Sequence, residues 1–228
     1  AKFEKVEGEK RPNPEEFARF ADLLCYVRMD LSQPEAYAAL RARLAERRTD
    51  TVVMYLSTAP SLFTTICQQL AASGLNTPQT RIVLEKPLGH DLASNRAINA
   101  AVGQAFKEQQ IFRIDHFLGK EPAQNILAFR FANGLFEPIW NRNFIDHVQI
   151  DVPETLGLGQ RSAFYEQTGA YRDMVVTHLL QILGFMAMEP PTSLEPGPIS
   201  EEKNKVFRSM LPIQPGDVVR GQYSGYRD

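Results

Sequence analysis

The chain has 228 residues, of which 43% are hydrophobic and 23% are charged, and its formal net charge is −2. This composition is typical of a globular protein with a sizeable core, and the small net charge argues against a general attraction to nucleic acid or to anionic membranes. An anionic ligand would therefore need a local cluster of cations.

The first half of the chain alternates predicted helices and strands. Helices are expected at 13–24, 32–48, from the segment after 57 up to 70, and at 90–106, with strands at 25–31, 51–57 and 80–86. Asn13 and Asp91 are expected caps, Pro14 occupies a first helical position, and the β-branched run at 51–57 predicts a buried strand. This alternation predicts a parallel sheet built from βαβ units.

The pattern changes after Ile114, where we place a domain boundary. Long, partly buried helices are expected at 120–136 and 172–188, and strands at 146–152 and 217–226. Residues 1–114 and 115–228 are therefore expected to form two different units.

Membrane and disulfide signals are weak in this sequence. The charged opening residues lack the apolar core of a signal peptide, and the longest apolar stretch, Leu179–Met188, is too short to cross a bilayer. Cys25 and Cys67 form no zinc-binding or CxxC spacing, so we expect reduced thiols in a cytoplasmic protein.

A phosphate-binding glycine turn is not obvious. The only G-x-G pattern, in Gly157–Ser162, follows a predicted strand, but no strong helix pattern opens directly behind it and no acidic ribose partner is evident. We therefore favour a flexible loop in the second domain over a dinucleotide fingerprint.

Lys86 is the first candidate site residue. It lies at the carboxyl end of a predicted parallel strand, where open α/β sheets bind ligands, and Pro87 turns the chain there, with a cis peptide bond as one way to make the turn. The alternative is a surface lysine paired with Glu85.

A second group of candidates lies in the stretch Ile111–Glu121. His116 and Lys120 have the composition of a phosphate-binding pair, whereas Asp115 would suit orienting a histidine from elsewhere in the fold. The alternative is a local ion pair between Asp115 and Arg113 or Lys120, which would contribute roughly 0–1 kcal/mol and need no function.

His178 is the other candidate for a catalytic role, and it lies among apolar residues of a predicted helix. The alternative is a core histidine without a chemical role. Asp173 lies five residues earlier, so the two are expected to line neighbouring parts of one pocket rather than to pair directly. His90 and His147 are interpreted as structural or exposed.

Several motifs together resemble the glucose-6-phosphate dehydrogenase family. They occur in the family's order and cover nearly the whole chain: "EKPLG" (85–89), "RIDHFLGKE" (113–121), "AQNILAFRFANGLFEPIWNR" (123–142), "YEQTGAYRDMVVTHLLQILGFMAMEPP" (165–191) and "GQYSGY" (221–226). The resemblance implies a partial Rossmann-type parallel sheet in residues 1–114, followed by part of an α+β domain with an antiparallel sheet in residues 115–228.

The resemblance also implies a role for each candidate. His178 matches the general base and Asp115 its carboxylate partner. The substrate-binding residues are expected to be His116 and Lys120 at the phosphate, Glu154 and Asp173 at the sugar hydroxyls, and Lys86 between substrate and coenzyme. Lys86 and Pro60 are expected to contact the coenzyme.

The implied activity is oxidation of glucose 6-phosphate to 6-phosphogluconolactone with hydride transfer to NADP, the first step of the pentose phosphate pathway, in a homodimer or tetramer. Phe117 stands where the family commonly has tyrosine, so weaker phosphate binding is expected. The amino-terminal glycine turn and the carboxyl-terminal part of the substrate domain are missing, so the chain is interpreted as the central part of a longer enzyme.

There are two rival functions. A glucose–fructose oxidoreductase type of dehydrogenase shares "EKPL" but lacks "RIDHFLGKE" and "ANGLFEPIWNR". A non-catalytic sugar-phosphate-binding or assembly module is the alternative from another class. An incomplete sheet would leave open edges, so we expect the isolated chain to be inactive.

Overall fold

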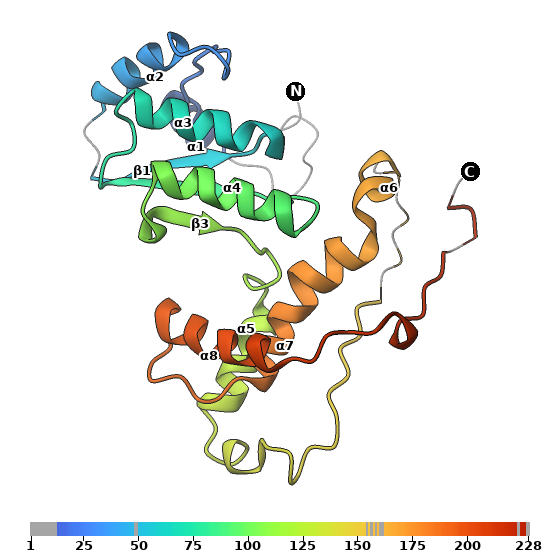
Figure 1. Ribbon diagram of the computed structural model, residues 1–228. Coiled ribbons are helices and arrows are strands. Elements are labelled where there is room, and N and C mark those ends of the chain that lie inside the picture. The colour runs from blue at the N-terminus through green and yellow to red at the C-terminus, as the bar shows by residue number, and fades with distance from the viewer. Residues whose placement is uncertain are drawn as a thin grey trace.

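The computed structural model describes residues 13–47, 50–153, 155, 157, 159, 162–222 and 224–226. A three-stranded parallel sheet with its helices precedes a largely helical region (Figure 1), which confirms the expected mixed α/β class. The strands are β1 (Val52–Leu56), β2 (Thr80–Leu84) and β3 (Ile111–Arg113). The helices are α1 (Pro14–Leu23), α2 (Ala36–Ala45), α3 (Phe63–Ala72), α4 (Leu92–Ala105), α5 (Glu121–Phe131), α6 (Ser162–Ala170), the π-helix η7 (Tyr171–Leu179), α7 (Leu180–Ala187) and α8 (Pro196–Ser209), with 3₁₀ turns η3 (Pro60–Leu62), η4 (Glu108–Gln110), η5 (Glu137–Ile139) and η8 (Pro215–Asp217).

The sheet has the strand order β1-β2-β3, and both pairs are parallel. Helix α3 connects β1 to β2 and α4 connects β2 to β3, which confirms the predicted βαβ units. In the register, Leu56 lies opposite Leu84, and Leu84 lies opposite Arg113. The three strands therefore end level with one another, and the loops that follow them leave the same edge of the sheet.

One face of the sheet carries the main core. Helices α3 and α4 pack together, and Ile82 and Leu84 of β2 are buried with Phe63 of α3 and Val102 of α4. Side chains of a strand alternate between faces, and those on the opposite face, Val53, Tyr55 and Phe112, remain 58%, 51% and 49% exposed. The strand predicted at 51–57 is present as β1, but the prediction that it is buried was wrong for one of its faces, because both connecting helices pack on the other face.

Two predicted helix starts are confirmed. The Asn13 side chain accepts a hydrogen bond of 2.9 Å from the Glu15 amide, and Pro14 occupies the first helical position of α1. The Asp91 carboxylate likewise accepts from the Ser94 amide at 2.7 Å at the start of α4. In both cases the cap satisfies an amide that has no partner within the helix.

The three stretches 25–31, 146–152 and 217–226 were wrongly predicted as strands. Their described residues are irregular or in turns, apart from the end of η8. A strand is stable only when its backbone groups pair with a neighbour, and the described part of the chain places no partner strand beside these stretches. The predicted antiparallel sheet is consequently not formed by the described residues.

A continuous helical column runs through the second half of the chain. Helix α6 bends at Gly169, whose φ of +70° is readily adopted only by glycine, and continues as η7 and then α7 (Figure 1). This column includes the helix predicted at 172–188. Helix α5 ends at Phe131, so the helix predicted at 120–136 is shorter than expected.

The glycine pattern in Gly157–Ser162 leads directly into α6, contrary to our expectation that no helix opens behind it. The described residues directly before it do not form a strand, and residues 158, 160 and 161 lie outside the described residues. The structure therefore gives this stretch no strand–turn–helix context for binding a dinucleotide.

The carboxyl end of α7 is held by two side chains from the segment that follows β3. Arg130, only 2% exposed, donates hydrogen bonds to the carbonyl oxygens of Phe185 at 2.8 Å and Met186 at 3.1 Å. Trp140 Nε1 donates to the Met186 carbonyl at 2.7 Å. The last carbonyls of a helix have no partner within the helix, so these donors anchor α7 to α5.

Among the described residues, none of the helices combines the length and the apolar character that crossing a membrane would require.

We predict that Arg130→Met destabilises the fold by about 3–5 kcal/mol, because it leaves Glu137, 3.6 Å from the guanidinium, without its cation and leaves the α7 carbonyls unpaired. Urea denaturation measures the change. Arg142→Met, at an exposed arginine nearby, is the matched control and should lie within about 0.5 kcal/mol of the wild type. Equal stabilities of the two variants would contradict the anchoring role.

Candidate functional site

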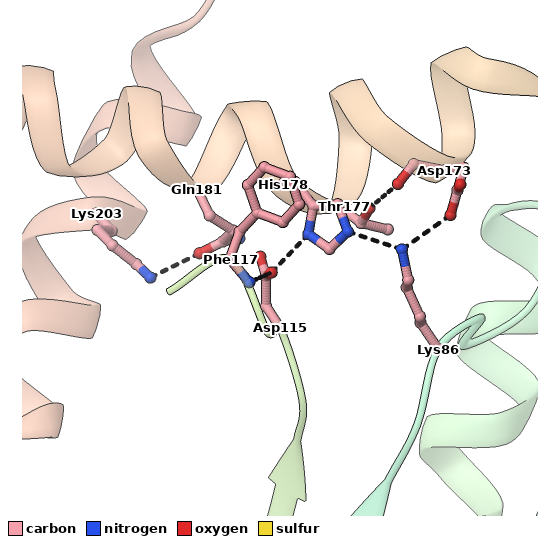
Figure 2. Close-up of polar contacts among 8 residues, drawn as sticks. All are labelled: Lys86, Asp115, Phe117, Asp173, Thr177, His178, Gln181 and Lys203. Atoms are coloured by element: carbon pink, nitrogen blue, oxygen red, sulfur yellow. Dashed lines mark hydrogen bonds and ion pairs between the residues drawn. The ribbon is translucent and has the colours of Figure 1, made fainter. Parts of the chain in front are cut away.

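The candidate site lies where the loops after the strands meet the helical column. Lys86 follows β2 by two residues and Asp115 follows β3 by two residues. Because these strands end level, both side chains leave the same edge of the sheet and point toward η7 (Figure 2). Ligands bind at this edge in open α/β sheets.

His178 and Asp115 form the centre of the site. The Asp115 Oδ1 atom lies 2.5 Å from His178 Nδ1, and the imidazole has no solvent-exposed surface. The same carboxylate oxygen accepts a hydrogen bond of 2.9 Å from the Phe117 amide, which holds Asp115 in its own turn. The pairing of Asp115 with a histidine from elsewhere in the fold, predicted from the residue types, is therefore present.

Lys86 determines which nitrogen of His178 carries the proton. Its Nζ atom lies 2.7 Å from His178 Nε2 (Figure 2). An ammonium group can only donate, so Nε2 must accept and be unprotonated. Nδ1 then carries the proton and donates to Asp115. This is the tautomer that a general base requires when Nε2 is the reacting atom.

Asp173 joins the site through the same lysine, since Lys86 Nζ lies 2.9 Å from Asp173 Oδ1. In the π-helix η7 the backbone hydrogen bonds join residues five apart, which brings Asp173 and His178 to the same side of the helix, where both contact Lys86. The two side chains line one site without pairing directly, as predicted, although the helix type was not anticipated.

The two other predicted residues, His116 and Lys120, lie on the neighbouring side of the imidazole. The Phe117 ring stacks on His178 with centroids 4.2 Å apart, and the His116 ring meets His178 edge-on at 4.7 Å. Lys120 Nζ lies 3.8 Å from the centroid of Phe117. No acidic partner of Lys120 occurs among the described residues, so its charge is available to an anion.

Burial lowers the pKa of His178 below its ordinary value of 6.5, and the charges of Lys86 and His116 act in the same direction. The hydrogen bond and the charge of Asp115 oppose this shift. The imidazole is therefore neutral at neutral pH, and it can accept a proton that Asp115 would stabilise once transferred.

The alternative interpretations, in which Asp115 and Lys86 form local surface ion pairs, differ from what the structure shows. Arg113 pairs with Glu108 at 2.6 Å rather than with Asp115, and Glu85 accepts a hydrogen bond from the Tyr55 hydroxyl rather than pairing with Lys86. His90 and His147 have side chains that are each 75% exposed, as predicted. Glu154, expected at the sugar hydroxyls, lies outside the described residues.

Two polar residues beside the site were not identified from the sequence. Lys203 of α8 donates a hydrogen bond of 2.6 Å to Gln181 Oε1 of α7, next to Asp115 (Figure 2). Lys203 belongs to a run of charged residues that is typical of a solvated helix face, so only the packing of α8 against α7 reveals its position.

The residues expected at a coenzyme lie at the same sheet edge. Pro60 begins the turn η3 after β1, and Lys86 follows β2, so their positions fit one side of a nucleotide-binding crevice. Among the described residues no cluster of three or more His, Cys, Asp or Glu side chains is arranged to hold a metal ion.

Two protein families match the chain. The family described as "Glucose-6-phosphate dehydrogenase, NAD binding domain" matches residues 1–125, and "Glucose-6-phosphate dehydrogenase, C-terminal domain" matches residues 127–228. The first match indicates a nicotinamide coenzyme.

Among curated proteins, the chain is 46% identical over 215 residues to a glucose-6-phosphate 1-dehydrogenase of Rhizobium meliloti, and 48% identical over 213 residues to one of Mycolicibacterium smegmatis. The first alignment covers 92% of this chain and 44% of the relative, and the second 90% and 43%. The chain thus spans less than half the length of these relatives.

Solved structures are similar as well. A crystal structure of glucose-6-phosphate 1-dehydrogenase from Mycobacterium avium superposes with a TM-score of 0.88 at 38% identity, covering 95% of this chain and 48% of that one. A structure of glucose-6-phosphate dehydrogenase in complex with its substrate glucose 6-phosphate gives 0.87 at 32% identity, covering 96% and 46%.

We predict that Asp115→Asn lowers the pKa of His178 further, because the carboxylate is the group that raises it against burial. Histidine imidazole signals followed by NMR across the pH range measure this change, with the His178 signal assigned by its loss in His178→Asn. Asp146→Asn, beside the exposed His147, is the control and should leave His178 unchanged. A higher pKa in Asp115→Asn would contradict the role of the carboxylate in stabilising the imidazolium form.

Proposed function

Because this chain belongs to the glucose-6-phosphate dehydrogenase family, an oxidoreductase family, we propose that its residues serve the oxidation of glucose 6-phosphate to 6-phosphogluconolactone. The observation that carries the proposal is the gathering of His178, Asp115 and Lys86 at the carboxyl edge of the sheet, with Lys120 beside them. A non-catalytic module would not need a neutral, oriented imidazole there.

His178 is proposed to remove the proton from the anomeric hydroxyl of the sugar. Its Nε2 lone pair is free of a proton, and Asp115 would stabilise the imidazolium that forms. Since the ring is buried, the hydroxyl must take the place that the Lys86 ammonium occupies, and Lys86, with 23% of its side chain exposed, is the group able to move aside. A positioned base contributes roughly 10²–10⁴-fold to the rate.

His116 and Lys120 are proposed to bind the 6-phosphate. Lys120 supplies a charge, and the imidazole of His116 supplies a directed donor. Both lie around the Phe117 ring, which stacks on the base, so a bound phosphate would hold the sugar at a defined distance from Nε2. Asp173 and Glu154 are proposed to accept hydrogen bonds from sugar hydroxyls.

The coenzyme is proposed to be NADP, held in part by Pro60 and Lys86. When bound it supplies the hydride acceptor for C1 of the sugar. Lys86 lies between the two proposed binding regions, at the end of β2, and would orient both ligands toward one another.

We further propose that residues 1–114 belong to the coenzyme-binding domain and 115–228 to the substrate domain of a cytoplasmic homodimer or tetramer acting in the pentose phosphate pathway. Because the chain spans 44% of the relative from Rhizobium meliloti, the activity is proposed for a protein that also contains the remaining family segments, and the isolated chain is expected to be inactive.

We predict that His178→Asn lowers kcat by about 10²–10⁴-fold with little change in KM, because it removes the base and keeps the polar contacts. The assay follows nicotinamide reduction with glucose 6-phosphate and either NADP or NAD, in a protein that adds the remaining family segments. His147→Asn, at an exposed histidine, should keep full activity. A His178→Asn enzyme as active as the wild type would remove the basis of the proposal.

We also predict that Phe117→Tyr lowers the KM for glucose 6-phosphate by roughly threefold to tenfold, because the added hydroxyl provides one more donor to the phosphate at about 1 kcal/mol. Phe129→Tyr, on α5, is the matched control for a Phe→Tyr change away from the site. An unchanged KM would mean that Phe117 does not border the phosphate.

A further inference from the structure

The two carboxylate oxygens of Asp115 differ in their hydrogen bonding. Oδ1 contacts His178 Nδ1 and the Phe117 amide. Oδ2 is buried and has no hydrogen-bond partner in the described part of the chain. A buried carboxylate oxygen without a donor is costly unless positive charge lies nearby, so a cation near Oδ2 would stabilise it.

Lys203 supplies that cation. Its ammonium donates to Gln181 Oε1 at 2.6 Å and lies 5.1 Å from the centroid of the Phe185 ring. Figure 2 shows it on the opposite side of Asp115 from Lys86. Burial lowers the pKa of Lys203, and the negative charge of Asp115, which lies close enough to act on it, raises it.

The position of Lys203 depends on Gly184. A Cβ atom added to Gly184 would lie 3.1 Å from Lys203 Cγ and 3.3 Å from Lys203 Cδ. The lysine stem therefore lies directly over the backbone of α7, and Gln181, one turn earlier on α7, receives its ammonium. The packing of α8 on α7 produces this position, so Lys203 differs from a solvated surface lysine.

The charges around the pair come from four elements. Lys86 follows β2, and Asp173 lies on η7. His116 and Lys120 lie in the segment of Asp115 itself, and Lys203 reaches in from α8. Glu202 of α8 instead contacts Lys205 at 2.6 Å. Lys203 is thus the cation that α8 directs toward Asp115.

We propose that Lys203 is a positioning residue for the base: its ammonium, held by Gln181 behind Asp115, opposes the arrival of a proton and so keeps the His178 imidazole unprotonated. This inference rests on the proposed function for its catalytic meaning. Removing the positive charge would raise the proton affinity of the Asp115–His178 pair, since one cation fewer opposes the incoming proton. The base would then remain protonated up to a higher pH.

The test compares Lys203→Met with Lys203→Arg, which keeps the charge, and with Lys205→Met, which removes an exposed lysine from the same helix. Lys203→Met is expected to raise the NMR titration midpoint of His178 and to move the acidic limb of kcat/KM in the same direction. One pH unit below the wild-type midpoint, kcat/KM of Lys203→Met relative to its own plateau should be roughly threefold to tenfold lower than the same ratio in the wild type. Lys203→Arg and Lys205→Met should behave like the wild type.

An unchanged midpoint in Lys203→Met overturns the inference, even if activity falls equally at every pH, since that result would indicate a purely structural role. If Lys203→Met does not fold, Gln181→Met removes the acceptor and retains the lysine; it should raise the midpoint, and failure to do so also overturns the inference. The NMR titration needs no turnover. The kinetic measurements use the protein that adds the remaining family segments. If its wild type is inactive, the proposed function is contradicted, while the titration still decides the role of Lys203.

Discussion

The arrangement of the site depends on one constraint, which is that a lysine ammonium donates hydrogen bonds and cannot accept them. Lys86 lies 2.7 Å from His178 Nε2, so the imidazole must present a lone pair there and carry its proton on Nδ1. Asp115 at 2.5 Å is the only oriented acceptor for that proton in the described site. The protonation pattern that the proposed general base requires thus follows from the position of a single cation.

This constraint can be met because three separate parts of the chain converge. The level ends of β2 and β3 bring Lys86 and Asp115 to one edge of the sheet, and η7 lies across that edge with His178 and Asp173 on one face. The helical column is held in turn by Arg130 at the carboxyl end of α7 and by the close approach of α8 at Gly184. Packing remote from the imidazole therefore determines where it points.

Local features of the fold could be predicted from the sequence. The caps at Asn13 and Asp91 depend on side chains a few residues from the amides that they satisfy, and the parallel sheet follows from the alternation of strands and helices. The expected strand at 146–152 failed because pairing depends on a partner elsewhere, which a residue pattern cannot reveal. The contact between Asp115 and His178 spans 63 residues and was anticipated in detail only through resemblance to a family. The π-helical turn and the place of Lys203 arise from packing between elements.

The contact that covers Nε2 has a consequence for selectivity. Because the free protein already satisfies this nitrogen, an arriving sugar hydroxyl exchanges one hydrogen bond for another and gains little net binding energy there. For the proposed substrate, affinity would then come from the phosphate end, where Lys120 has no acidic partner among the described residues. Under the proposed function, a sugar without the phosphate would therefore bind weakly, because the free protein already satisfies the nitrogen that its hydroxyl would contact.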